Sequence, residues 1–176
     1  LNPQNGEPAS ERLQKMNREE IEGMLIDNSD EPYAAEIARA IAGKLRKGQK
    51  IDTTTKLAEL IGEALSFLPE KERKEAVKKS CARVFQALRV DVNSEFEVLE
   101  AFLTKLPSCM APGGRIAILT FHSGEDRLVK HAFKEGKKAG IYSEVAEDVI
   151  RPSGEECVKN PRAKSTKMRW AIRTEE

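Results

Sequence analysis

The sequence has 176 residues, of which 39% are hydrophobic and 34% charged, as is typical of a folded globular chain and not of a disordered one. This length allows one core of ordinary size or two small ones. Thirty basic and 29 acidic residues leave a net charge of +1, so the overall charge favours no class of partner. Three cysteines lie far apart and form no CxxC pair, which argues against a disulfide framework or a zinc site and for a reducing compartment.

No apolar stretch of the sequence approaches the roughly 20 residues of a membrane span, and no basic-then-apolar signal opens it. We therefore expect no membrane partner. The chain begins at Leu1 with a polar, loop-like stretch over residues 2–6. This beginning leads us to expect that the sequence starts in the middle of a longer protein.

Residues 1–82 are predicted to form a helical domain. Apolar residues recur at three- and four-residue spacing over 32–45, which predicts a helix that ends before Gly48. Thr53 favours the N-cap of a following helix, which is stopped near Pro69. Almost no run alternates with period two, and no chemistry is visible in this part of the chain.

Residues 83–176 have a different character. A helix is predicted after Asn93 or Ser94, followed by a tight Pro-Gly-Gly turn and a strand over 115–121. Because this strand is a short, mostly apolar run, we expect it to be buried on both faces. After this strand we predict a helix over residues 125–138 and a strand over 143–150. A short helix then starts at residues 153–156, and a last strand covers 168–173.

This order of elements is typical of the closing half of a doubly wound α/β sheet. We expect about three strands with helices on both faces, and one edge of unpaired backbone, because the opening half of the sheet is not in this sequence. Self-association into a homodimer is one way in which such an edge would be covered.

The densest polar stretch follows the strand predicted over 115–121 and reads HSGEDR. Ligands bind outside the carboxyl ends of the strands in such sheets, so His122, Glu125 and Asp126 are the candidate catalytic residues. A structural interpretation explains the same residue types: Ser123 caps the next helix, the two carboxylates favour its positive N-terminus, and Arg127 pairs with one of them. The spacing leaves both interpretations open.

Basic residues gather near the end of the sequence, with seven Lys or Arg against two Glu over residues 151–173. Such an excess suits a phosphate backbone, and it also suits a solvated charged face. Similarly, Arg83, Arg89 and Asn93 project away from a predicted apolar helix face, which a charged surface with one cap would explain as well.

Four segments together carry a family resemblance. They read RVFQALRVDVNSEF, APGGR, FHSGEDRLVK and NPRAKSTKMR at residues 83–96, 111–115, 121–130 and 160–169. The chain thereby resembles the MraW family of SAM-dependent ribosomal RNA methyltransferases, for which the first and third segments are specific. Residues 1–82 are similar, more loosely, to the family's inserted domain of the substrate-recognition type. Two departures are Asn2, where aspartate is usual, and Gly124, where leucine is commonest, which predicts a looser turn after His122.

The resemblance implies methyl transfer from SAM to the exocyclic N4 of a cytidine in the 16S RNA of the small ribosomal subunit. It also implies a class I, Rossmann-like methyltransferase sheet with a helical inserted domain. The family's glycine-rich SAM loop lies upstream of Leu1, so we expect no cofactor-binding residue, no bound SAM and no activity in this chain alone. We expect no metal site.

The implied chemistry suggests roles for the polar residues. The N4 lone pair is delocalised into the ring, so the site must align this poor nucleophile and accept its protons as charge develops. Asp126 or Glu125 would accept from N4–H, and His122 would orient or stack the unstacked base. The expected RNA-binding residues are Arg83, Arg89, Asn93, Ser123, Arg127, Lys130, Arg162, Lys164, Lys167 and Arg169.

A competing hypothesis is a non-catalytic RNA- or ribosome-binding remnant that kept the substrate surfaces and lost the cofactor. The sequence upstream of Leu1 would discriminate between the two. A glycine-rich strand–loop–helix there supports the enzyme, whereas a reading frame that opens at Leu1 supports the binding module.

Overall fold

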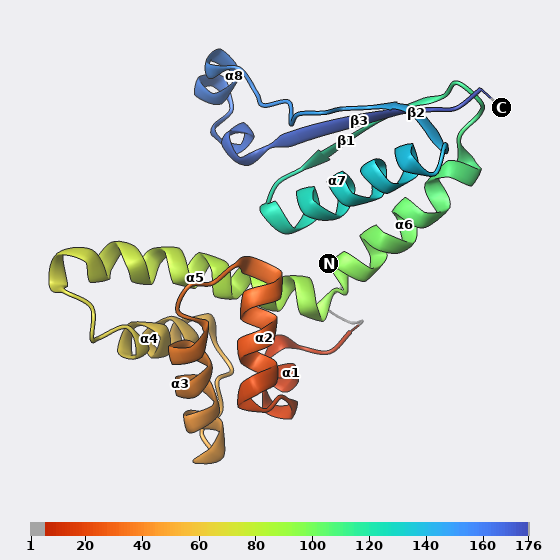
Figure 1. The fold of residues 1–176 in the computed structure, drawn as a ribbon. Coiled ribbons are helices and arrows are strands. Elements are labelled where there is room, and N and C mark those ends of the chain that lie inside the picture. Colours follow the sequence, from red (N-terminus) through yellow and green to blue (C-terminus); the bar gives the residue numbers. More distant parts are fainter. Residues whose placement is uncertain (1–5, 176) are drawn as a thin grey trace. The chain divides into compact units, whose positions relative to one another are not determined.

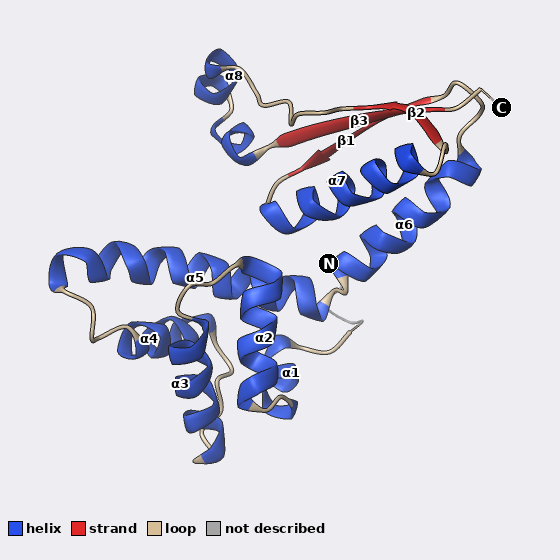
Figure 2. Ribbon diagram, viewed as in Figure 1, coloured by secondary structure: helices blue, strands red, loops and turns tan. Residues whose placement is uncertain are grey.

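The computed structural model describes residues 6–175, so Asn2 lies outside the described residues. The chain forms two compact units, Leu1–Glu95 and Phe96–Glu176, and the described strands all lie in the second (Figure 2). The division predicted after residue 82 falls inside helix α5 (Glu70–Val92), so the first unit continues to the end of that helix. No described helix has the length and apolar character needed to cross a membrane.

The first unit is helical, as the sequence predicts, and α5 is its longest helix. α5 packs against α1, α2 and α4, while α3 contacts α2 and α4 (Figure 1). The other helices are α1 (Ala9–Lys15), α2 (Arg18–Ser29), α3 (Ala34–Arg46) and α4 (Thr54–Ala64). Aliphatic side chains from all five helices form one core, which includes Leu13, Ile21, Leu25, Ile37, Ile41, Ile61 and Val84.

The helix ends of the first unit follow from local sequence. The helix predicted over 32–45 is α3, and it stops before Gly48, whose φ of 71° lies in the left-handed region that glycine adopts without strain. Thr53 is the N-cap of α4 and accepts a hydrogen bond from the Lys56 N–H, as predicted. Pro69 then stands just before α5.

The second unit contains a three-stranded sheet in the order β1–β3–β2. β3 lies in the middle and is antiparallel to both neighbours, so β1 and β2 run parallel to each other and are joined through α7. A doubly wound sheet is mostly parallel, whereas every pairing among the described strands is antiparallel, because the last strand inserts between the first two. The bounds are α6 (Glu95–Cys109), β1 (Arg115–Thr120), α7 (Ser123–Lys138), β2 (Tyr142–Val145), α8 (Gly154–Lys159), the 3-10 helix η1 (Pro161–Ser165) and β3 (Lys167–Arg173).

One face of this sheet packs on α6 and α7 (Figure 1). Leu103 and Leu106 of α6 and Val129 and Phe133 of α7 meet Ala171 of β3 in this core. Ile116 and Ile118 of β1 pack against this core and are partly buried, which removes apolar surface from water.

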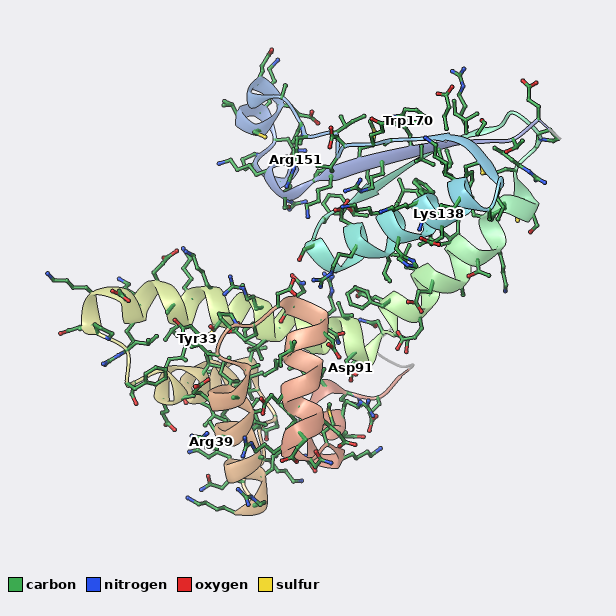
Figure 3. The ribbon with its side chains drawn as sticks, viewed as in Figure 1. Tyr33, Arg39, Asp91, Lys138, Arg151 and Trp170 are labelled. Atoms are coloured by element: carbon green, nitrogen blue, oxygen red, sulfur yellow. The ribbon has the colours of Figure 1, made fainter. Side chains whose placement is uncertain are left out.

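The opposite face of the sheet is open, so the prediction that β1 is buried on both faces is wrong. Alternate residues of β1 are exposed, and Leu119 is 57% exposed. Trp170, labelled in Figure 3, pairs with Ala117 across the strands and lies on this open face. A short apolar run in the sequence does not show whether a strand is covered on one face or on both. No described element of the second unit covers the open face of this sheet.

Candidate functional site

The polar residues predicted as a site lie where β1 ends and α7 begins. The N-cap of α7 is His122, in extended conformation, and not Ser123, which is the first helical residue. His122 makes no side-chain cap hydrogen bond. Glu125 instead folds back from the first turn of α7, and its carboxylate accepts a hydrogen bond of 2.9 Å from the Phe121 N–H. The carboxylate of Glu125 thus fixes the junction between strand and helix.

The imidazole of His122 rests against Glu125. His122 Nε2 lies 3.3 Å from Glu125 Oε1, and the His122 side chain is 11% exposed. This contact lowers the pKa of Glu125 to about 2; burial opposes the shift, and the Phe121 N–H adds to it. Neither ring nitrogen of His122 has a hydrogen bond of good geometry from the described residues. The ring therefore keeps hydrogen-bonding capacity beside an ionised carboxylate.

Asp126 forms an ion pair with a residue far along the chain. Arg169 of β3 donates to both carboxylate oxygens, at 2.7 and 3.2 Å, and Lys167 Nζ lies 3.8 Å away. Asp126 and Arg169 are 8% and 7% exposed. Burial raises the pKa of Asp126, but the hydrogen bond and charge of Arg169, with the charges of Lys167 and Lys130, outweigh it, so the pKa lies below its usual value. In the structural interpretation of the sequence, Arg127 is the partner of one of the two carboxylates, and the pairing of Asp126 with Arg169 was not predicted.

The residues predicted to bind RNA are not equally accessible in the second unit. Lys167 and Arg169 form ion pairs with Asp126, and their side chains are 16% and 8% exposed. The remaining members on α7 and η1 are exposed, and in η1 the buried Ala163 anchors its neighbours to the protein. Exposed cationic side chains at the surface are thus Arg127, Lys130, Arg162 and Lys164.

In the first unit, Arg83 lies next to a buried acid that the sequence pattern did not reveal. Glu31 is 3% exposed, and its Oε1 accepts hydrogen bonds from the Ser80 hydroxyl at 2.8 Å and the Tyr33 N–H at 3.1 Å. Arg83 lies 4.0 Å from the other oxygen. Glu31 thus ties the segment after α2 to α5, and no local sequence signal marks it, because Ser80 is 49 residues away.

Arg89 and Asn93, also in the first unit, line a hollow of 560 Å³ beside α5. Its apolar wall includes Phe85 and Leu88, and Arg89 is held by an ion pair of 3.0 Å to Glu95. Asn93 donates to the Arg89 carbonyl. The prediction that Arg89 and Asn93 project away from the apolar face is not met at this hollow, because both residues line it together with Phe85 and Leu88.

Gly124, for which the sequence predicts a looser turn after His122, lies in a closely packed environment. It is buried, and the Phe96 ring fills the space beside it. The absence of a side chain at one position is compensated by a large side chain that is distant in the sequence.

The adjacent glycines 113 and 114 do not fit a methyl-donor site. They form the turn that enters β1, and a Cβ on Gly114 would lie 2.7 Å from the Ala111 carbonyl oxygen. A glycine-rich cofactor loop follows a strand and opens a helix, whereas this turn precedes a strand. Gly113, with φ of 69°, serves the geometry of the turn itself. No SAM cradle is formed by these described residues.

Comparison with known proteins identifies the family. The model of the MraW methylase family matches residues 1–174. The chain is 62% identical over 173 residues to ribosomal RNA small subunit methyltransferase H 1 of Lachnoclostridium phytofermentans, a match that covers 98% of this chain and 47% of that protein. It is 62% identical over 175 residues to the protein of the same name from Agathobacter rectalis, covering 99% and 50%. The chain thus spans about half the length of these curated relatives. The resemblance of the four sequence segments is confirmed: the chain belongs to the MraW methylase family.

Proposed function

We propose that this chain supplies the RNA-facing part of a SAM-dependent methyltransferase that modifies N4 of a cytidine in 16S ribosomal RNA, in the cytoplasm and on the small ribosomal subunit. The observation that carries the proposal is the pair formed by His122 and Glu125 at the carboxyl end of β1. This end is where α/β sheets bind their ligands. The names of the relatives, which are ribosomal RNA small subunit methyltransferases, point to the same class of substrate.

The side chains at this end suit an unstacked cytosine. The N4 amine needs an acceptor for its protons as charge develops during transfer. His122 has ring nitrogens without a hydrogen bond of good geometry and lies beside the ionised Glu125, so it is the group that we assign to the base. Glu125 stabilises the ring through its carboxylate. Asp126 would reach a base only if its pair with Arg169 opened, so we assign it to fixing α7 on β3.

The open parts of the sheet support a larger methyltransferase domain. β1 is an edge strand in the order β1–β3–β2. Its open face carries Leu119, and Phe121, which follows the strand, is 56% exposed. Exposed apolar surface beside an unpaired edge is where a further part of a sheet would be added. β1, α7 and β2 form the strand–helix–strand crossover from which doubly wound sheets are built. A class I, Rossmann-like sheet with the helical first unit, up to Glu95, as inserted domain is therefore our proposal for the whole protein.

SAM would supply the methyl group when bound by the rest of such a protein, since the turn at Gly113 and Gly114 does not fit it. The side chains of this chain would hold the RNA. Exposed cations on α7 and η1 would meet phosphates, and Arg89 and Asn93 would present polar groups at the rim of the hollow in the first unit. We propose no methyl-donor contact with residues 6–175.

A chimera tests this proposal. Residues 1–176 would be joined to the part of the Lachnoclostridium relative that lies outside the match, and incubated with small ribosomal subunits and SAM labelled in its methyl group. We expect label in 16S RNA from the chimera and loss of most label in the His122→Ala variant. The relative itself is the positive control. RNA binding without any label from the chimera would instead favour the second candidate, a non-catalytic binding remnant, which the exposed cations on α7 and η1 support.

A further inference from the structure

The position of Gly124 has no room for a side chain, whereas its backbone conformation does not require glycine. Gly124 is the second residue of α7, and it does not belong to the described glycines with positive φ. A Cβ built on it would lie 2.4 Å from Phe96 Cζ and 3.1 Å from Cε1. Two carbon atoms cannot approach so closely, so the Phe96 ring occupies the space that a side chain at position 124 would need.

The same Phe96 ring lies against His122. The ring centroids of Phe96 and His122 are 5.7 Å apart, with an angle of 43° between the planes. The Cβ position of Gly124 is also 3.3 Å from His122 Nδ1. On its other side His122 meets Glu125, which is itself held by the Phe121 N–H. The imidazole thus lies between an aromatic ring from α6 and a carboxylate from α7.

We propose that Phe96 and Gly124 are a matched pair of positioning residues that hold the His122 ring against Glu125. The pair works by volume: a larger side chain at position 124 requires a smaller one at position 96. The inference rests on the proposed function, in which His122 contacts the target base. The matched pair itself is inferred from the interatomic distances given above. Phe96, Gly124 and the His122–Glu125 contact all belong to the second unit.

The consequence for catalysis is one of alignment. A displacement of about 1 Å in a group that orients a substrate can cost about 100-fold in rate. A side chain at position 124 would push Phe96 away and leave the imidazole free to rotate from Glu125. The residues at 96 and 124 do not need to touch the substrate to produce this effect.

The test uses two readouts on three variants. The first readout is the pKa of Glu125, followed by carboxyl carbon NMR in the 176-residue chain. We expect it to rise from about 2 toward the ordinary value of 4.5 in Gly124→Leu and Phe96→Ala, and to return most of the way in the double variant Phe96→Ala/Gly124→Leu. The second readout is kcat of the chimera, which should fall about 100-fold in each single variant and recover to within about 10-fold in the double one.

Gly136→Ala is the matched control, because a Cβ at Gly136 of the same helix would lie 2.5 Å from Tyr142 Cδ2. It brings a methyl group against an aromatic ring, as Gly124→Ala does, but away from His122, so the pKa of Glu125 should not move. If Gly124→Leu does not fold, Gly124→Ala replaces it, with a smaller rise expected.

An unchanged Glu125 pKa in the single variants, or a double variant no better than its parents, overturns the matched pair. A pKa that rises and returns while kcat stays constant upholds the pair and instead contradicts the role of His122 in the proposed function.

Discussion

The first turn of α7 carries two carboxylates with different tasks. Glu125 holds the loop before the helix through the Phe121 N–H and contacts His122, whereas Asp126 ties the helix to β3 through Arg169. The sequence predicts a candidate site at residues 122–127 because they follow a strand in an α/β chain, and in the structure they do lie after β1. The different contacts of Glu125 and Asp126 could not be predicted, since Arg169 is 43 residues away from Asp126 and Phe96 comes from a different helix.

Replacing Asp126 by asparagine should destabilise the second unit. The change leaves the Arg169 guanidinium buried without its charge partner, and breaking a buried pair in this way costs about 3–5 kcal/mol. Urea unfolding of the chain measures the loss. Glu135→Gln is the control on the same helix, because Glu135 pairs with Lys138 at the surface, and its unfolding curve should match the wild type. If Asp126→Asn left stability intact and lowered kcat of the chimera, Asp126 would be the acceptor for the N4 protons.

Acid should destabilise the chain through Glu125. Its pKa of about 2 in the folded state lies below the ordinary 4.5, so the stabilisation is present above the unfolded-state value and is lost as pH falls through this range. The depressed pKa of Asp126 acts in the same direction. Unfolding free energies of wild type and Glu125→Gln, compared across this range, should converge as pH falls. Parallel pH profiles for the two proteins would mean that Glu125 is not stabilised by its contacts.

At the scale of elements, helices were predictable and sheet pairing was not. The helix periodicity of 32–45 and the cap at Thr53 are local signals, and the structure confirms both. The pairing of β1 with β3 joins residues that are distant in the sequence, and neither propensity nor periodicity encodes which strand lies in the middle.

Hydrogen exchange should reveal the open edge of β1. Amides of β1 that point away from β3 have no described strand beside them, so we expect them to exchange quickly, while amides of the central strand β3 are protected. Native-state exchange followed by NMR gives both values in one sample. Uniform slow exchange along β1 would show that its edge is covered, most simply by a second copy of the chain, and sedimentation would then detect a homodimer.

The cations on η1 should contribute to RNA affinity. Arg162 and Lys164 are exposed, and removing a side chain that neutralises one phosphate should reduce the salt slope of binding by about one unit. Binding of the chimera to 16S RNA over a series of salt concentrations measures this slope for Arg162→Ala/Lys164→Ala. Lys71→Ala/Lys74→Ala, at the exposed start of α5, is the control with the same change in charge. Equal slopes for both variants would make η1 an ordinary solvated surface.

At the scale of the whole molecule, the sequence segments were sufficient for the family, because each is a run of adjacent residues. The same segments were not sufficient to predict which edge and which face of the sheet are open. The chain spans about half the length of its relatives, and an open face such as that around Leu119 becomes visible only when the strands are placed in space.

The most direct test of the proposed function is the chemical identity of the methylated nucleoside. After reaction of the chimera with small ribosomal subunits and SAM, 16S RNA would be digested to nucleosides and analysed by mass spectrometry against standards. We predict N4-methylcytidine, present with the chimera and strongly reduced with its His122→Ala variant. A methyl group on a ring carbon, on another base or on ribose would contradict the proposal, as would unmodified RNA under conditions in which the relative methylates its substrate.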